Sequence, residues 1–477
     1  MKRIFGIDFG TTSSAVVGTI IEDGIIKQIK YGVGSGVPFP SIVAISKTTG
    51  EILTGLEVKN KHEELSGTHE IIYSIKTHLD KENCKVIAGE EYYAEDIACE
   101  LFTSLKRTVK ERTNEDMTEA VVAIPVGFSA RKREKLRIAA VMAGIKITSF
   151  VSEPTAAFFS NYDNLKSAST IVVFDWGGGT LDVSVLKNEN GNIYEISKSG
   201  RNIAGDFIDN KIAKYVHAKI LQEKQIETRF DDMPFTLQGK MRVQCERAKI
   251  NFSENDMSMI SVLNYGQYGI VRTALDYKVF SELIAPEIKM AMDCLAEALV
   301  QADIGKANVD KVLLVGGSSK LRSLREQMFA EFGDKVFIPE NPEWDIGQGA
   351  SLLALQGGSN FSNQSVGMII SDGSYYEFLG KDTKLKEWKK NFRFAITDSS
   401  ESAQFVFDGS PDIASMQSRC KTLDVPSYGF LQEKIEVTTE VDENLVFRLT
   451  AKSDRKSRNE QMTWEYENLK CYYKLLQ

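Results

Sequence analysis

The stretch that decides the fold is residues 6–14, which read GIDFGTTSS, and residues 174–182 repeat its plan as FDWGGGTLD. Each stretch places an aspartate at the end of an apolar run, then glycine and threonine at a turn, then a second apolar run. Glycine lets the backbone adopt positive φ and approach an anion closely, and successive turn amides can point at phosphate oxygens. Either stretch alone is compatible with an ordinary tight turn. Two copies in matching contexts predict duplicated lobes that hold one nucleotide.

A third stretch, residues 312–320, reads VLLVGGSSK and is typical of a buried strand that ends in glycines before a helix. Such glycines let a flat ligand lie against the backbone, and the start of a helix favours negative charge. The sequence contains no G-x-x-x-x-G-K-[ST], so a Walker-type loop is not predicted. Asp8 and Asp175 lead the two turns and could hold Mg²⁺, which prefers one or two carboxylates together with phosphate and water.

Composition excludes several classes of function. The 477 residues carry 58 basic and 66 acidic side chains, a formal net charge of −8, which argues against nucleic acid or an anionic membrane as a partner. We expect no spanning helix, because no run of about 18 apolar residues occurs, and no secretory signal, because Asp8 interrupts the N-terminal apolar run. Six scattered cysteines without a C-x-x-C pair and only four histidines predict neither disulfides nor a zinc site, and we expect a cytoplasmic protein.

Residues 1–356 alternate apolar β-branched runs with helical patterns, which predicts an α/β fold with a sheet covered on both faces. The expected strands lie at 3–8, 15–21, 120–124, 171–175, 181–186 and 312–315. The expected helices lie at 94–111, 130–143, 153–162, 207–224, 236–251, 276–302 and 320–332.

A polar, glycine- and serine-rich segment at 357–365 is interpreted as a linker. The sequence pattern changes at residues 366–477, where short runs of alternating apolar and polar residues are separated by turn residues. This pattern predicts a compact antiparallel β domain. The clearest runs are 392–396, 404–407, 435–441 and 446–451. Residues 460–477 fit either a final strand or a short helix.

In this order the three stretches make the chain resemble the ATPase superfamily of sugar kinases, actin and heat-shock chaperones, and within it the seventy-kilodalton heat-shock chaperones (DnaK type). Residues 6–14, 174–182 and 313–321 are similar to the two phosphate motifs and the adenosine motif of that family. Residues 122–128, VAIPVGF, resemble its connecting segment, and residues 153–157, EPTAA, resemble one of its helix starts. The resemblance implies a two-lobed actin-like ATPase domain at 1–356 and a β-sandwich substrate-binding domain at 366–477. The family's helical lid would follow residue 452, where about 25 residues remain, so a lidless variant is expected.

The resemblance implies a role for each matching residue. Asp8 and Asp175 would hold Mg²⁺ through water, and Lys76, Glu153, Asp175 and Thr180 would act in hydrolysis. Lys76 would neutralise charge on the γ-phosphate, although the sequence alone favours a solvated surface lysine and only the resemblance favours the catalytic role. The residues expected to contact ATP or ADP are Gly10, Thr11, Thr12, Gly177, Gly178, Gly179, Asp182, Gly205, Glu246, Lys249, Ser253, Gly316, Gly317, Ser318, Lys320 and Glu343.

Some positions depart from the family. Lys320 stands where an arginine is frequent, so stacking on adenine should be weaker. Pro125 and Arg133 match residues that link nucleotide state to the second domain, but Gly127 replaces a tyrosine and residues 359–365 replace a leucine-rich acidic linker. Coupling between the domains is therefore the implied property that these departures affect most.

The resemblance favours an ATP-driven chaperone that binds extended polypeptide clients and works with a co-chaperone and a nucleotide-exchange factor. A nucleotide-switched protein with one dedicated partner is the alternative, favoured by the expected absence of a lid and by the altered linker. A small-molecule kinase is disfavoured, because no acceptor site is evident and the EPTAA segment indicates the chaperone branch. A polymerising actin-like filament is likewise disfavoured.

Overall fold

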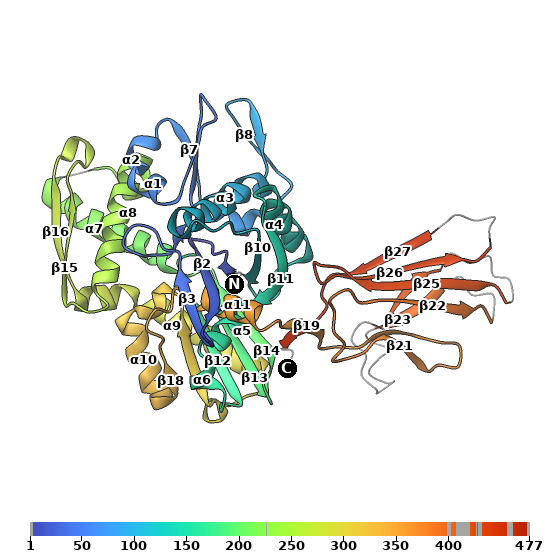
Figure 1. Cartoon of the computed structure of the whole chain (residues 1–477). Helices are drawn as coiled ribbons and strands as arrows, with labels where there is room; N and C mark the ends of the chain where they lie inside the picture. Colours follow the sequence, from blue (N-terminus) through green and yellow to red (C-terminus); the bar gives the residue numbers. More distant parts are fainter. Residues whose placement is uncertain are drawn as a thin grey trace. The chain divides into compact units, whose positions relative to one another are not determined.

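The structure is a computed structural model that describes residues 3–225, 227–397, 402–406, 420–425, 427, 432–455 and 461–474. The chain divides into two compact units, whose elements are labelled in Figure 1. The first unit comprises Met1–Val126, Lys135–Asn190 and Glu195–Leu355. The second comprises Gly127–Glu134, Gly191–Tyr194 and Gln356–Gln477.

The first sheet of the first unit is built around β1, which pairs antiparallel with β2 and parallel with β10. Phe5 and Ile7 of β1 are buried, as the continuous apolar pattern predicts for a strand covered on both faces. The strands follow the order β11 (Lys146–Ser152), β10 (Glu119–Ile124), β1 (Ile4–Asp8), β2 (Ser13–Glu22) and β3 (Ile25–Lys30), with β4 (Phe39–Pro40) beside β2.

The second sheet repeats this plan around β12, which pairs antiparallel with β13 and parallel with β17. Its strands follow the order β18 (Val336–Phe337), β17 (Lys311–Val315), β12 (Thr170–Trp176), β13 (Leu181–Glu189) and β14 (Asn192–Arg201). In both sheets an aspartate lies at or near the end of the hairpin's first strand. Asp8 is the last residue of β1, and Asp175 is the last but one of β12. The predicted mixed α/β fold is thus confirmed.

Helices α5 (Glu153–Ser160) and α11 (Asp345–Leu355) pack against each other. Helix α11 also packs on β1, β2 and β10, and α5 also packs on strands of both sheets. The two helices touch backbone to backbone, because a Cβ on Gly349 would lie 1.7 Å from the carbonyl oxygen of Ala156. The buried Asp345 side chain adds polar contacts, accepting hydrogen bonds from Asn161 Nδ2 (3.0 Å) and Ser160 Oγ (3.3 Å). Helix α5 is therefore fixed from one side by α11.

The remaining helices of the first unit form the outer layers. They are α1 (Gly55–Asn60), α2 (His62–Leu65), α3 (Ala94–Thr113), α4 (Ala130–Met142, of which Lys135–Met142 belong to this unit), α6 (Tyr162–Leu165), α7 (Gly205–Lys224), α8 (Phe235–Asn251), α9 (Tyr277–Gln301) and α10 (Arg322–Phe332). Short 3₁₀ turns are η1 (Ile75–His78), η2 (Phe230–Asp232), η3 (Gly266–Tyr268), η4 (Lys306–Asn308), η5 (Gly317–Lys320) and η6 (Gly333–Lys335). Small sheets pair β5 (Val43–Ser46) with β6 (Ile52–Thr54) and β7 (His69–Ile72), β8 (Lys85–Ile87) with β9 (Glu90–Tyr92), and β15 (Met257–Val262) with β16 (Val271–Asp276).

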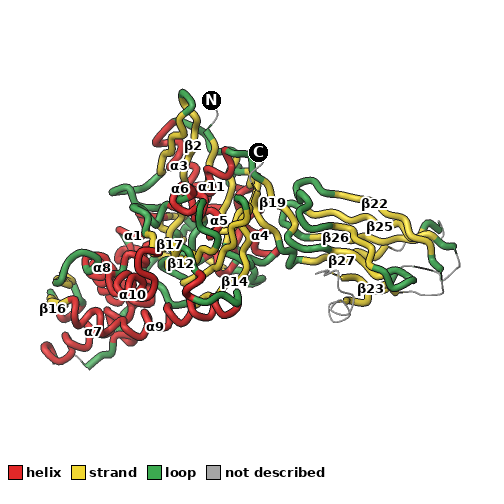
Figure 2. The backbone as a smooth tube through the Cα atoms, turned by 90° about the horizontal axis from the view of Figure 1, so that it is seen from below, coloured by secondary structure: helices red, strands yellow, loops and turns green. Residues whose placement is uncertain are grey.

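The second unit contains two antiparallel sheets that share one hydrophobic core. One has the order β21 (Tyr375–Leu379), β20 (Val366–Ile369), β23 (Ser402–Val406) and β24 (Cys420–Asp424). The other has the order β22 (Lys389–Ala395), β25 (Lys434–Val441), β26 (Phe447–Ser453) and β27 (Gln461–Tyr466). Every second residue of β25, from Ile435 to Val441, is buried, as a period-2 pattern demands. The described part of 366–474 forms strands and turns in Figure 2, as a sandwich does.

Strands form in two segments of the second unit for which the sequence did not predict a strand alone. The segment 357–365 is not a plain polar loop, because β19 (Ser359–Ser362) pairs antiparallel with β28 (Cys471–Lys474). Sequence alone missed this strand because its partner lies more than a hundred residues away. The end of the chain, left open between strand and helix, forms the strands β27 and β28. Of the predicted run 404–407, residue 407 lies outside the described residues.

Candidate active site

The turn of the first aspartate hairpin has room only for glycine, and the turn of the second is closed by a backbone hydrogen bond. A Cβ on Gly10 would lie 2.0 Å from the carbonyl oxygen of Ser13, so this turn closes too tightly for any side chain. In the second hairpin the Gly177 amide donates to the carbonyl oxygen of Thr180 at 3.0 Å. The two turns therefore present backbone amides at the ends of β1 and β12, which is the arrangement that can cradle phosphate oxygens.

The two hairpins lie against each other. A Cβ on Gly178 would lie 2.7 Å from Oγ1 of Thr12, and a Cβ on Gly179 would lie 2.6 Å from Cγ2 of Thr11. The Thr12 hydroxyl also donates to Oδ2 of Asp206 at 3.2 Å. The residues of the two similar stretches, far apart in the sequence, thus meet at one place in the first unit.

Four carboxyl groups gather around these turns: the buried Glu153 and the half-buried Asp8, Asp175 and Asp182. Burial, reinforced by the charge of Glu153, raises the pKa of Asp8 to about 7, although Lys76 opposes the shift. Burial also raises the pKa of Asp175 well above its usual value, and the charges of Glu153, Asp182 and Asp8 raise it further. The pKa of Asp182 is raised by burial, against a hydrogen bond from Thr180 and the charges of Lys76 and Lys198.

Lys76 supplies a buried positive charge to this cluster. Its Nζ lies 2.6 Å from Oε1 of Glu153, and the two side chains are only 6% and 9% exposed. Burial lowers the pKa of Lys76, but the charges of Glu153 and Asp8 outweigh burial and raise it overall, so the ammonium persists. Lys76 is the second residue of η1. The residue before η1 is Ser74, a non-glycine residue with φ of 54°, so the backbone is strained next to the turn that positions Lys76.

The first turn of α5 places Glu153. Ser152 is the N-cap, and its Oγ accepts a hydrogen bond from the Thr155 amide at 3.3 Å. Pro154 occupies the second helical position, where its missing N–H costs nothing. Burial raises the pKa of Glu153 even though Lys76 lowers it.

These carboxylates fit a divalent cation. Burial is the main cause of the raised pKa values of Asp8 and Asp175, and the charges of neighbouring carboxylates add to it while Lys76 opposes it. A bound cation would compensate this negative charge. Among the described residues, no three His, Cys, Asp or Glu side chains are placed to ligate a metal ion directly. Asp8 and Asp175, the two residues expected to hold Mg²⁺ through water, both belong to this cluster.

The predicted adenosine residues fall into an inner and an outer group. In the inner group, Lys249 Nζ donates to the Gly205 carbonyl at 3.0 Å and lies 2.8 Å from Asp209 Oδ2. The Ser318 hydroxyl donates to the Gly177 carbonyl at 2.8 Å. Gly316, with φ of 79°, has no room for a side chain because a Cβ would lie 2.6 Å from Asp175 Oδ1. The inner group therefore adjoins the second phosphate turn.

The outer group is more exposed. Glu246 pairs with Lys59 at 2.9 Å, and Lys320 pairs with Glu343 at 2.9 Å. Gly317 begins η5 beside Gly316, and the Ser253 carbonyl accepts a hydrogen bond from Arg325 at 2.8 Å. Among the described hydrogen bonds, none joins Ser253 to Glu246 or Lys249.

Sequence reasoning missed Asp206, Asp209 and Lys59 at this site. Asp206 lies in the first turn of α7 and Asp209 just after that turn, and burial raises the pKa of Asp209 to about 7 against the charge of Lys249. A glycine followed by acids at a helix start was a usable signal for these two. Lys59 lies on α1, where its sequence context carries no signal.

Of the residues expected to link the domains, Arg133 belongs to the second unit. Its guanidinium donates to the carbonyl oxygens of Phe128, Asn444 (2.6 Å) and Glu467 (3.2 Å), all of the same unit. Burial lowers the pKa of Arg133. Pro125 directly follows β10 in the first unit.

A helix both long enough and apolar enough to cross a bilayer is missing from the described ranges. Compared with known proteins, residues 4–470 match the sequence model of one family, described as Hsp70 protein. This match spans nearly the whole chain, including both units and all of the residues placed above. Members of the family are ATPases and ATP-dependent chaperones that bind polypeptide clients. The chain therefore belongs to the Hsp70 family.

Proposed function

We propose that this protein binds ATP with Mg²⁺, hydrolyses it slowly to ADP and phosphate, and uses the nucleotide state to control binding of extended polypeptide segments. The observation that carries the proposal is the contact between the two aspartate hairpins, with the Lys76–Glu153 ion pair beside them. Two amide-rich turns that meet next to a buried cation and several carboxylates suit a triphosphate better than any other common ligand.

In this proposal the backbone amides of 10–12 and 178–180 bind phosphate oxygens. Lys76 neutralises charge that develops on the terminal phosphate, which is electrostatic work done in a site of low dielectric constant. Glu153, held 2.6 Å from Lys76, orients the attacking water, and Thr180 and Asp182 help to hold that water. Asp8 and Asp175 would hold Mg²⁺ through water, and the ion would neutralise phosphate charge when bound.

Adenosine would lie against the inner group. Gly205 and Gly316 leave the backbone bare, and Lys249, oriented by its contacts with the Gly205 carbonyl and Asp209, would donate to the ribose. The outer pairs, Lys59–Glu246 and Lys320–Glu343, would border the base. A lysine at 320 gives a compact charge rather than a planar guanidinium, so stacking on the base should be weak.

The second unit would bind the polypeptide. Its sheets end in the strands β21, β24, β22 and β27, and a strand edge can pair with an extended peptide through the backbone while alternate side chains enter pockets. A co-chaperone and a nucleotide-exchange factor are the further partners that we expect.

One observation favours the alternative of a dedicated partner. Residues Ser359–Ser362, at the place of the family's linker, form β19 and are hydrogen-bonded to β28 within the second unit. A segment committed to such a pairing is less available to switch between arrangements, which would suit constitutive binding of a single partner.

The decisive experiment measures the affinity of labelled peptides for the full chain by fluorescence anisotropy, with ATP and with ADP. A difference of tenfold or more, about 1.4 kcal/mol, would support nucleotide control. Lys76→Met serves as the control that holds ATP without turnover, and it should keep the ATP-state affinity over time. Equal affinities would contradict nucleotide control. Titration calorimetry without heat on addition of ATP and Mg²⁺ would contradict the nucleotide site itself.

A further inference from the structure

A partly buried carboxylate beside α5, Glu195 of β14, has no part in the roles given above. The Ser152 hydroxyl and the Thr155 hydroxyl (3.2 Å) both donate to its Oε1. These two residues flank Glu153 and Pro154, so the contacts of Glu195 fall on the first turn of the helix that carries Glu153. We propose that Glu195 is a positioning residue for ATP hydrolysis, which holds this turn so that Glu153 stays in contact with Lys76.

The hydrogen bonds explain how the carboxylate acts at a distance. The Ser152 hydroxyl has one proton, and because that proton goes to Glu195, a lone pair of the same oxygen is directed at the Thr155 amide. Glu195 thereby fixes both the N-cap hydroxyl and the Thr155 side chain. Without it the hydroxyls would rotate to other acceptors, the cap would loosen, and Glu153 would move relative to Lys76.

A second residue of β14 ties this strand to the same site. Lys198 donates to the carbonyl oxygen of Val126 at 2.7 Å, and its charge lowers the pKa of both Asp182 and Glu195. Lys198 also lines a small cavity together with Glu153, Asp175 and Asp182, with room for about one water molecule. The cavity shows that side chains of β14 reach the enclosed space bounded by the predicted catalytic carboxylates.

Keeping the partly buried Glu195 carboxylate charged costs free energy, and its two hydrogen bonds from hydroxyl groups do not require that charge. Burial raises its pKa, the charge of Glu153 raises it further, and the two hydroxyls and Lys198 oppose the shift. An asparagine or glutamine could accept the same hydrogen bonds without repelling Glu153. The geometry therefore predicts that the acceptor oxygen matters more than the charge.

The proposal rests on the proposed function and is tested by steady-state ATPase kinetics on the full chain with three variants. Glu195→Ala should lower kcat by about tenfold or more, with KM for ATP and the affinity for ADP within about twofold, because misplacing one group costs turnover rather than binding. Glu195→Gln should retain at least half of the wild-type kcat. The matched control, Glu297→Ala, removes another carboxylate that accepts from a serine of β14, Ser199 at 2.9 Å, and should leave kcat unchanged.

A kcat of Glu195→Ala within twofold of wild type, or equal loss in the Ala and Gln variants, would overturn the proposal. If Glu195→Ala does not fold, the isosteric Thr155→Val, which deletes one donor, should still lower kcat by about threefold with KM unchanged. An inactive wild type would count against the proposed function instead. A crystal structure of Glu195→Ala then decides: loss of the Lys76–Glu153 contact supports the positioning role, and an unmoved pair overturns it.

Discussion

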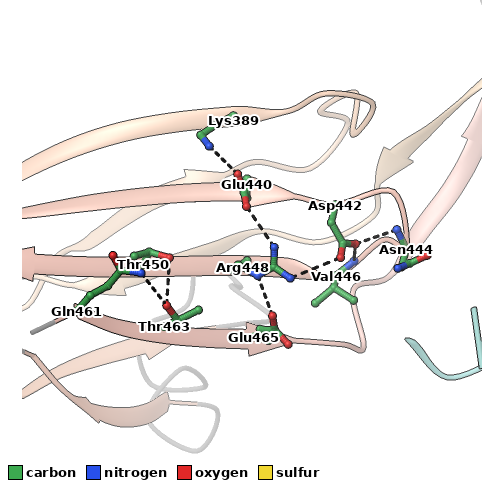
Figure 3. A network of polar contacts seen from close by, with 10 residues as sticks. All are labelled: Lys389, Glu440, Asp442, Asn444, Val446, Arg448, Thr450, Gln461, Thr463 and Glu465. Atoms are coloured by element: carbon green, nitrogen blue, oxygen red, sulfur yellow. Dashed lines mark hydrogen bonds and ion pairs between the residues drawn. The ribbon is translucent and has the colours of Figure 1, made fainter. Parts of the chain in front are cut away.

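The two units use ion pairs in opposite ways. In the first unit, Lys76 and Glu153 form a pair that is almost fully removed from water. In the second, Lys389, Glu440, Arg448 and Glu465 form a chain of pairs across β22, β25, β26 and β27, each residue standing directly opposite the next (Figure 3). The side chains of this surface network are 29% to 58% exposed.

The difference shows what each arrangement is for. Burying two charges costs several kcal/mol of desolvation per ion, which their attraction rarely recovers in full, so a buried pair is poor evidence of stability and better evidence of chemistry. Pairs on the surface contribute about 0–1 kcal/mol each, but opposite charges on facing strands favour one register over a slipped one. The first arrangement therefore fits the proposed reaction, and the second favours the register of the sheet.

The largest expected effect comes from breaking the buried pair. Lys76→Met removes the charge but keeps most of the side-chain volume, and we expect ATP turnover to fall by about a hundredfold or more, because the developing phosphate charge loses its counter-ion. Single-turnover hydrolysis measures the loss, and calorimetry with ADP should show an affinity within about threefold of wild type.

The matched control makes the same substitution in the surface network. Lys389→Met removes the 2.8 Å contact with Glu440 and should change neither turnover nor, by more than about 0.5 kcal/mol, the free energy of unfolding. Comparable losses in both variants would show that the methionine, rather than the buried charge, is responsible.

A buried carboxylate held by neutral donors sharpens the comparison. Burial raises the pKa of Asp345 to about 6, against hydrogen bonds from Asn161 and Ser160. The folded protein thus binds the Asp345 proton more tightly than the unfolded chain does. The stabilisation that comes from protonated Asp345 is therefore present at low pH and is lost as pH rises from about 4 through 6. Asp345→Asn should remove this dependence and unfold at higher denaturant than wild type at pH 8, by up to about 3 kcal/mol. At pH 4 the two proteins should agree, and a constant difference across this range would contradict the assignment.

A small effect is expected at the centre of the surface network. Arg448 contacts Glu465 at 2.7 Å and Glu440 at 3.3 Å, so Arg448→Met removes the counter-ion that these two acids share from the strand between them. We expect a loss of about 1 kcal/mol or less in denaturant unfolding at low ionic strength. In 1 M salt, where the screening length is about 3 Å, the loss should nearly vanish. A loss that salt does not reduce would mean that the arginine acts through packing.

Much of the fold follows from local patterns in the sequence. The hairpins at Asp8 and Asp175 could be predicted because aspartate, glycine and threonine specify the turn within a few residues. Strand β19 could not, because Ser359–Ser362 is polar and its strand character depends on pairing with β28. Pairing between distant segments leaves no local signal, and this separates the elements that were predicted from those that were not.

The site divides in the same way. Phosphate-binding turns are visible in the residues themselves, whereas Lys76 lies in an unremarkable segment and was proposed only from the family resemblance. Its burial against Glu153 is a property of the folded chain. Glu195 is harder still, because it acts through Ser152 and Thr155 and no motif surrounds it.

The backbone contact between Gly349 and Ala156 makes α5 and α11 one mechanical part. Helix α11 ends at Leu355, and the next residue, Gln356, begins the main segment of the second unit. A force on the chain at Leu355 would act on α11, and through the contact of Gly349 with Ala156 it would act on α5, the helix that bears Glu153. A displacement of α11 within the first unit would therefore move the first turn of α5, and Glu153 with it.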